Sequence, residues 1–185
     1  MTDLEPTGAA IDIIMPLRDG RPMAQAVVDG IVRQGFPYRL WVSTHPTKGT
    51  ADARNHVKQL ATTDYTLMLT GDMVLPDGGL QRVVDFLDEH ADYGAIGLCR
   101  HPNRRFYRVD EWLNAHHVDM SCVLFRRDVL AKITFADNWN AARVGREKLM
   151  GPCECANCCH DIRAMGLRIG FVPEVYVEHL DHPPR

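Results

Sequence analysis

Short apolar runs alternate with amphipathic segments along the first half of the chain. The first run, residues 11–15, is rich in β-branched side chains and ends at Pro16, which is typical of a buried strand. Residues 23–34 instead repeat apolar positions at helical spacing, and Gly35 and Pro37 prevent the helix from continuing. The same reasoning predicts strands at 38–43, 65–69 and 93–99, and helices at 51–61 and 80–90.

The second half of the chain is less regular. Its apolar pattern predicts a strand at 118–126, a short helix at 127–133, a polar loop at 135–150, a helix at 156–165 and strands at 168–172 and 175–178. Because strands and helices alternate in the first half, the predicted fold class is α/β, with a mostly parallel central sheet and helices on both faces. Ligands of such sheets bind at the carboxyl ends of the strands. We expect residues 1–10 to be a flexible leader and 11–185 to form a single domain.

Composition narrows the range of functions. A hydrophobic fraction of 45% and a charged fraction of 24% are those of an ordinary globular protein, and the net charge of −3 gives no general attraction to nucleic acid or anionic membrane. No apolar run is long enough for a transmembrane segment, and the acidic N-terminus is unlike a signal peptide. The sequence therefore predicts a cytoplasmic protein.

Asp72 is the first candidate for chemistry. It follows the predicted strand at 65–69, at the edge of the sheet where ligands are expected. A carboxylate there can grip a hard divalent cation through oxygen, and that cation would neutralise a diphosphate leaving group. The alternative is that Asp72 forms a turn or caps a helix.

Motifs spread over residues 11 to 182 point more specifically to one family. They are the apolar run ending Met15-Pro16, then Ala53-Arg54-Asn55, the strand Tyr65-Thr66-Leu67-Met68-Leu69 with Asp72 and Pro76 after it, Ser121-Cys122-Val123-Leu124-Phe125-Arg126-Arg127, Phe135-Ala136-Asp137, Glu154 with Gly166, and Val172-Pro173-Glu174-Val175-Tyr176-Val177-Glu178-His179. In this order they resemble the family-2 glycosyltransferases, which have the GT-A fold, a Rossmann-like single domain of the nucleotide-diphospho-sugar transferase superfamily.

This resemblance implies an enzyme that moves a sugar from a nucleotide-diphosphate donor to an acceptor hydroxyl or amine, with Mn²⁺ or Mg²⁺ as cofactor. It implies that Asp72 and His179 ligate the metal, with His182 as an alternative to His179, and that Glu154 is the catalytic general base. Arg54 would bind the diphosphate, or would be a structural arginine that contacts carbonyl groups. The implied donor-binding residues are Pro16, Arg18, Asp19, Ser43, Arg54 and Asp72.

Three positions depart from the family pattern. Thr70 replaces the first aspartate of the Asp-x-Asp metal motif, Ser43 replaces the aspartate that recognises the base, and Cys155 replaces the second residue of the Glu-Asp pair. These changes keep two alternatives open. One is a non-catalytic zinc- or nucleic-acid-binding module on a degenerate GT-A scaffold. The other is a nucleotidyltransferase, although residues 17–21 lack the glycine-rich phosphate loop that such enzymes normally carry.

Two further clusters bear on partners. Four cysteines crowd residues 153–159, and we expect them to pack as small apolar side chains rather than to bind zinc or act in redox chemistry, since no second ligand pair is present. Residues 100–108 mix four arginines with two aromatics. His116-His117 follow them, as candidates to face the donor phosphates or the metal, with a surface position as the alternative. Arginines and aromatics together suit phosphate contact and base stacking, so a modified nucleic-acid base is one candidate acceptor. The others are a saccharide, a lipid-linked group and a protein.

Overall fold

Seven strands form one sheet in the computed structural model, which describes residues 11–17, 23–43, 49–100, 115, 117–136 and 154–180. The strand order across the sheet is β2-β1-β3-β6-β5-β7-β4. The strands are β1 (Ile11–Pro16), β2 (Tyr38–Ser43), β3 (Tyr65–Leu69), β4 (Met73–Val74), β5 (Tyr93–Arg100), β6 (Cys122–Arg126) and β7 (Arg168–His179). The helices are α1 (Gln25–Val32), α2 (Thr50–Val57) with the 3₁₀ turn η1 (Lys58–Leu60), α3 (Gly79–Glu89), α4 (Arg127–Lys132) and α6 (Glu154–Ala164).

Most of the described strands run in one direction, as the sequence predicts. β1 is parallel to both β2 and β3, and β5 is parallel to β7. β6 lies antiparallel between β3 and β5, so β5 points the same way as β3, while β4 lies antiparallel to the end of β7. The prediction of a mostly parallel sheet is confirmed.

The antiparallel strand β6 decides which loops meet. Because β6 runs against β3, Cys122 at its start pairs with Leu69 at the end of β3. The residues just before β6 therefore lie at the same edge of the sheet as the residues just after β3. This edge carries the carboxyl ends of β1, β2 and β3, where the sequence predicts a ligand site.

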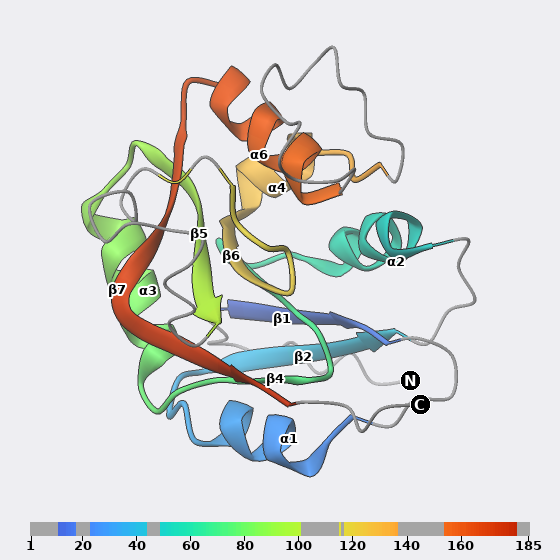
Figure 1. Cartoon of the computed structure of the whole chain (residues 1–185), viewed down its shortest axis with the longest axis vertical. Helices are drawn as coiled ribbons and strands as arrows, with labels where there is room; N and C mark the ends of the chain where they lie inside the picture. The colour runs from blue at the N-terminus through green and yellow to red at the C-terminus, as the bar shows by residue number, and fades with distance from the viewer. Residues whose placement is uncertain are drawn as a thin grey trace.

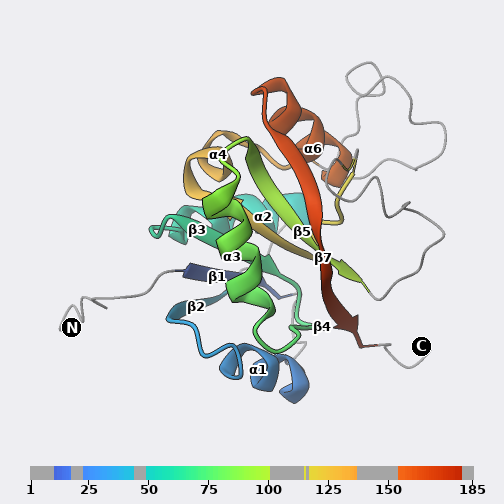
Figure 2. The ribbon, with the colours of Figure 1, turned by 90° about the vertical axis from the view of Figure 1, so that its left-hand side faces the viewer.

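Apolar side chains alternate between the two faces of the sheet and build a core on each. In β1, Ile13 faces one core and Ile14 the other, as period-two alternation requires. The apolar sides of α1 and α3 cover the first face, and α3 packs on β5 and β7 (Figure 2). α2, α4 and α6 cover the opposite face (Figure 1). Helices on both faces are thus confirmed.

Several predicted boundaries differ from the structure. The strand predicted at 118–126 begins only at Cys122, because residues 120 and 121 form a turn. The two strands predicted at the C-terminal end are one strand, β7, which pairs first with β5 and then with β4. β4 itself was not predicted, since two residues are too few to show a periodic pattern. None of the described helices has the length and hydropathy to cross a bilayer.

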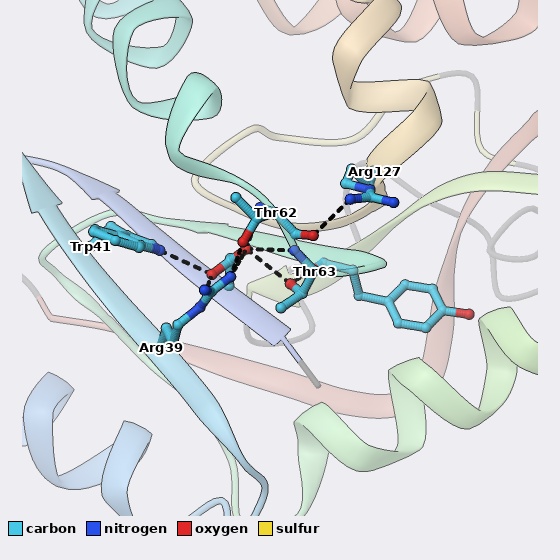
Figure 3. Close-up of polar contacts among 7 residues, drawn as sticks. Arg39, Trp41, Thr62, Thr63 and Arg127 are labelled. Atoms are coloured by element: carbon cyan, nitrogen blue, oxygen red, sulfur yellow. Dashed lines mark hydrogen bonds and ion pairs between the residues drawn. The ribbon is translucent and has the colours of Figure 1, made fainter. Parts of the chain in front are cut away.

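A buried carboxylate holds the opposite edge of the sheet together. Asp12 in β1 is 0% exposed. Its oxygens accept from Arg39 Nε at 2.9 Å and Nη2 at 3.0 Å, from Trp41 Nε1 at 2.9 Å, and from the backbone amides of Thr62 and Thr63 at 2.6 and 2.8 Å. Figure 3 shows these four donor residues converging from β2 and from the loop before β3. Every buried lone pair thus finds a donor, which is the condition under which a buried charge is tolerated.

The hydrogen bonds to Asp12 also set its ionisation. Burial alone would raise the pKa of this carboxyl group, but the bonds from Thr62, Thr63, Trp41 and Arg39 outweigh burial and lower the pKa from 3.8 to about 2. Because the unfolded chain binds this proton more readily than the folded chain, the linked stabilisation is present above pH 4 and is lost as the pH falls toward 2. A shift of this size corresponds to about 2 kcal/mol.

We therefore predict that Asp12→Asn destabilises the fold by roughly 3 kcal/mol at pH 7, because the amide places an N–H against donors that needed an acceptor. Urea unfolding at pH 7 measures this loss, and a series from pH 5 to pH 2 measures the linked term. The wild type should lose more stability than Asp12→Asn over that series. The exposed Asp85→Asn is the control and should follow the wild type. Equal pH dependence of Asp12→Asn and wild type would contradict the assignment.

Candidate functional site

The carboxyl edge of the sheet brings together residues from three strands. Pro16 at the end of β1 pairs with Ser43 at the end of β2, and the Leu17 amide donates to the Ser43 carbonyl at 2.9 Å. Gly71, in the turn after β3, packs directly on Leu17, since a Cβ at position 71 would lie 2.7 Å from a Leu17 methyl carbon. Pro16, Ser43 and the turn that carries Asp72 are therefore neighbours, as the sequence predicts.

The turn that carries Asp72 is fixed by backbone hydrogen bonds on both sides. The Thr70 amide donates to the Ser121 carbonyl at 2.8 Å, and the Met73 amide donates to the Thr70 carbonyl at 3.2 Å. The Leu180 amide then donates to the Asp72 carbonyl at 2.9 Å. Since Met73 pairs with His179 in the β4–β7 ladder, the ladder holds residues 72 and 179 side by side.

The side chains of Asp72 and His179 face each other across this ladder. His179 Nε2 lies 3.4 Å from Asp72 Oδ2, and the two side chains are 33% and 23% exposed, respectively. The other carboxylate oxygen, Oδ1, accepts from the Thr70 hydroxyl at 2.7 Å. The structure thus joins two residues that are 107 positions apart in the numbering (179 − 72) into one partly exposed pair.

This pair has the chemistry to bind a hard divalent cation. A carboxylate oxygen and an imidazole nitrogen are both ligands that Mn²⁺ and Mg²⁺ accept. Neighbouring ligands of an octahedral ion with bonds near 2.1 Å lie about 3 Å apart, close to the 3.4 Å separation seen here. No group of three or more His, Cys, Asp or Glu that could hold a metal occurs within the described ranges. The described part of the chain therefore offers two ligands at this place, Asp72 and His179.

Two neighbouring side chains of helix α2, Arg54 and Asn55, bind the backbone of the segments before β6 and after α4. Arg54 is 3% exposed, and its Nη2 donates to the Met120 carbonyl at 3.1 Å, next to the residue that holds Thr70. This contact is of the structural kind, and the donor-binding role of Arg54 stays a prediction. Asn55 binds the backbone of Phe135 twice, with Nδ2 donating to the carbonyl at 2.7 Å and Oδ1 accepting from the amide at 3.0 Å.

Asp119 and Ser121 complete the polar edge, and sequence reasoning did not single them out as functional residues. The Asp119 carboxylate accepts from the Ser121 amide at 2.8 Å and from the Ser121 hydroxyl. The Ser121 carbonyl in turn accepts from the Thr70 amide. An aspartate two residues before a serine is a common turn signal and could have been noticed, but only the antiparallel pairing of β6 places this turn beside Asp72.

The cysteine cluster belongs to the core where the structure describes it. Cys158 and Cys159 on α6 are fully buried in the apolar layer that covers the sheet. The Cys159 thiol also accepts from the Val118 amide at 3.4 Å and lies 3.8 Å from the Val118 carbonyl. Burial raises the pKa of the Cys158 thiol well above its ordinary value, so this group stays protonated. For these two residues, packing is the role that the structure supports.

The remaining predicted site residues have side chains that the structure does not describe. Glu154 begins α6, but its side chain is not described, so its catalytic role stays a prediction. The predicted residues outside the described ranges are Arg18, Asp19, His116, Cys153 and His182, with the basic stretch 101–108.

The chain matches the model of one protein family over more than half of its length. The model of glycosyl transferase family 2 matches residues 19–149, which is more than half of the chain. The chain belongs to glycosyl transferase family 2. No curated protein matches it closely enough to count as a relative.

Three solved structures of proteins in complex with nucleotide sugars share the fold of this family member. A mannosyltransferase from Pyrobaculum calidifontis in complex with GDP-mannose and Mn²⁺ matches with a TM-score of 0.69 and 19% identity over 97% of this chain and 59% of that chain. TarS from S. aureus in complex with UDP-GlcNAc matches with a TM-score of 0.63 and 12% identity, over 95% of this chain and 59% of that chain. The Drosophila galactosyltransferase 7, a mutant in complex with manganese, UDP-Gal and xylobiose, matches with a TM-score of 0.60 and 16% identity, over 94% of this chain and 71% of that chain. At these identities the likeness shows the GT-A fold, and the chain spans only 59% of the length of the first two proteins.

We predict that Asn55→Ala destabilises the protein by about 1–3 kcal/mol, because it removes both bonds to Phe135 and leaves an amide and a carbonyl without their partner. Urea unfolding at pH 7 measures the loss. The exposed Gln59→Ala, one turn further on, is the matched control and should stay within about 0.5 kcal/mol of wild type. An Asn55→Ala variant as stable as the control would show that the two bonds contribute nothing net.

We also predict that Cys158 is inert toward alkylation in the folded protein. Burial and the raised pKa both suppress the reactive thiolate, so iodoacetamide at pH 8 should modify Cys158 at least about 1000-fold more slowly in buffer than in urea. Half-buried Cys155 on the same helix is the internal control, and mass spectrometry of the peptide separates the two sites. Equal labelling rates for Cys158 in both conditions would exclude a core position.

Proposed function

We propose that this member of glycosyl transferase family 2 moves a sugar from a nucleotide-diphosphate donor to an acceptor hydroxyl or amine, with the help of Mn²⁺ or Mg²⁺. The observation that carries the proposal is the pairing of Asp72 with His179 at the carboxyl edge of the sheet, with Nε2 and Oδ2 3.4 Å apart. The family match and the neighbours whose complexes contain Mn²⁺ with GDP-mannose or UDP-Gal support it.

On this proposal Asp72 and His179 hold the cation, and the donor diphosphate supplies further oxygen ligands. The cation, when bound, neutralises charge on the diphosphate as it departs. Pro16 and Ser43 lie at the same edge and would contact the nucleotide, together with Arg18 and Asp19. The family aspartate that recognises the base is Ser43 here, so the side chain at this position offers a hydroxyl in place of a carboxylate.

The acceptor would be activated from α6. In an inverting transfer, Glu154 takes the proton of the acceptor hydroxyl or amine as the new bond to the anomeric carbon forms. The bond between that carbon and the diphosphate oxygen breaks, and the electron pair leaves with the nucleoside diphosphate. Glu154 is proposed for this role because it occupies the first position of the family Glu-Asp pair, whose second position is Cys155. A thiol is a poor substitute for a carboxylate base, because a thiol is mostly protonated at pH 7 whereas a carboxylate is ionised and can take a proton.

Thermal unfolding with GDP, UDP, ADP and their sugar conjugates, with and without Mn²⁺, tests the proposal. A diphosphate present at 100 times its dissociation constant stabilises the folded state by about 2.7 kcal/mol, so one base should raise the melting temperature by roughly 5–10 °C when Mn²⁺ is present. Asp72→Asn and His179→Gln should abolish the part of the shift that needs metal. Asp77→Asn, with an exposed side chain five positions from Asp72, is the control and should keep it.

The proposal is wrong if no nucleoside diphosphate stabilises the wild type in the presence of Mn²⁺. It is also wrong if Asp72→Asn shows the same metal-dependent shift as the wild type. Once the stabilising base is known, hydrolysis of its sugar conjugate, or transfer of the sugar, is measured on the wild type. Glu154→Gln should retain donor binding but lose turnover by at least about 100-fold.

A further inference from the structure

The residue that replaces the first aspartate of the metal motif makes a direct contact with the second. Thr70 Oγ1 lies 2.7 Å from Asp72 Oδ1 and 3.3 Å from the Ser121 carbonyl. Both neighbours can only accept a hydrogen bond when Asp72 is ionised, and a hydroxyl has a single proton to give. The shorter contact goes to the charged acceptor, and the Ser121 carbonyl already accepts from the Thr70 amide. The proton is therefore directed at Asp72, as a charge-assisted hydrogen bond.

The donor in this contact is held rigidly. The Thr70 backbone is fixed through its amide to Ser121 and through its carbonyl to the Met73 amide, at 2.8 and 3.2 Å. A β-branched side chain has few χ1 choices, so the hydroxyl has little freedom once the backbone is fixed. Because Oδ1 of Asp72 is engaged by Thr70, rotation of the carboxylate is restrained, and Oδ2 is the oxygen that lies toward His179 Nε2.

An aspartate at position 70 could not do this. Two ionised carboxylates at a separation near 2.7 Å repel each other, and neither has a proton to donate. With threonine there, the metal motif carries one carboxylate in place of two, and that carboxylate is oriented before any cation arrives. The substitution therefore exchanges a potential ligand for a hydrogen-bond donor.

We propose that Thr70 is a positioning residue for the cation: its hydroxyl orients Asp72 so that Oδ2 and His179 Nε2 bind one metal ion together. This inference rests on the proposed function, since it assigns Thr70 a role in the metal site that Asp72 and His179 form. Thr70 itself is not a ligand on this account. Loss of a hydrogen bond to a metal-ligating side chain typically lowers metal affinity 10–100-fold, which sets the size of the expected effect.

Titration of Mn²⁺ followed by electron paramagnetic resonance tests the proposal, in the presence of the nucleoside diphosphate that stabilises the wild type. Thr70→Val removes the hydroxyl but keeps the branched shape, and it should weaken Mn²⁺ binding by about 10–100-fold. Thr70→Ser keeps the hydroxyl and should stay within about 3-fold of wild type. The wild type should also show nitrogen coupling from the imidazole of His179 to bound Mn²⁺, and this coupling should be weakened or absent in Thr70→Val.

Two results would overturn the proposal. The first is a Thr70→Val variant with wild-type Mn²⁺ affinity and wild-type nitrogen coupling. Equal losses in Thr70→Ser and Thr70→Val overturn it too, because the hydroxyl is then not the group that matters. Circular dichroism and thermal melting without metal check that both variants fold. If Thr70→Val does not fold, Thr70→Ala replaces it in the comparison with Thr70→Ser.

Failure of this inference can be told apart from failure of the proposed function. If the wild type binds no Mn²⁺ with any nucleoside diphosphate, the proposed function fails and the Thr70 comparison has no basis. If the wild type binds, Asp72→Asn does not, and Thr70→Val matches the wild type, then the function stands and Thr70 is only part of the turn.

Discussion

The buried carboxylate of Asp12 is the interaction on which the arrangement of the central strands depends. It lies near the start of β1 and ties that strand to β2 through Arg39 and Trp41, and to the loop before β3 through Thr62 and Thr63. A charge that is 0% exposed is tolerated only when donors surround it, and these donors come from two segments other than β1 itself. The segments must therefore keep one relative position, and the register of β1 with its neighbours follows.

That register determines what meets at the other end of the sheet. With β1 and β2 in register from Ile11 to Pro16, Pro16 and Ser43 end at the same level. β3 is in register with β1 as well, so the turn after Leu69 emerges beside Leu17. Asp12 at one edge and Asp72, the proposed metal ligand, at the other therefore have different surroundings. The first is enclosed by donors, whereas the second is partly exposed beside a histidine and can exchange partners for a cation.

The structure shows what Thr70 and two residues of the Ala-Arg-Asn motif contact. Thr70 contacts Asp72 directly, and the proposal that it orients the carboxylate accounts for a site with a single acidic side chain after β3. Arg54, which the family resemblance implied as a donor contact, is buried and bonded to the Met120 carbonyl, so it supports the loop that leads into β6. Asn55, its neighbour in the same motif, holds the chain after α4. The Ala-Arg-Asn motif thus fastens two segments that the site needs in place.

The sequence by itself determined the alternation of strands and helices, because apolar periodicity reports which face of each element is buried and needs no knowledge of its partner. It also predicted Asp72 and His179 as a pair, through ordered motifs that resemble a family, and the structure brings the two together. Only the tertiary structure decided that β6 is antiparallel, that the turn at Asp119 and Ser121 lies beside Asp72, and that the Thr70 hydroxyl donates to the Asp72 carboxylate. The first two facts depend on contacts between segments about 50 residues apart in sequence, and local patterns carry no information about which partner a strand will find. The Thr70 contact spans only two residues, but the turn that allows it is fixed by the bond from the Thr70 amide to the distant Ser121 carbonyl.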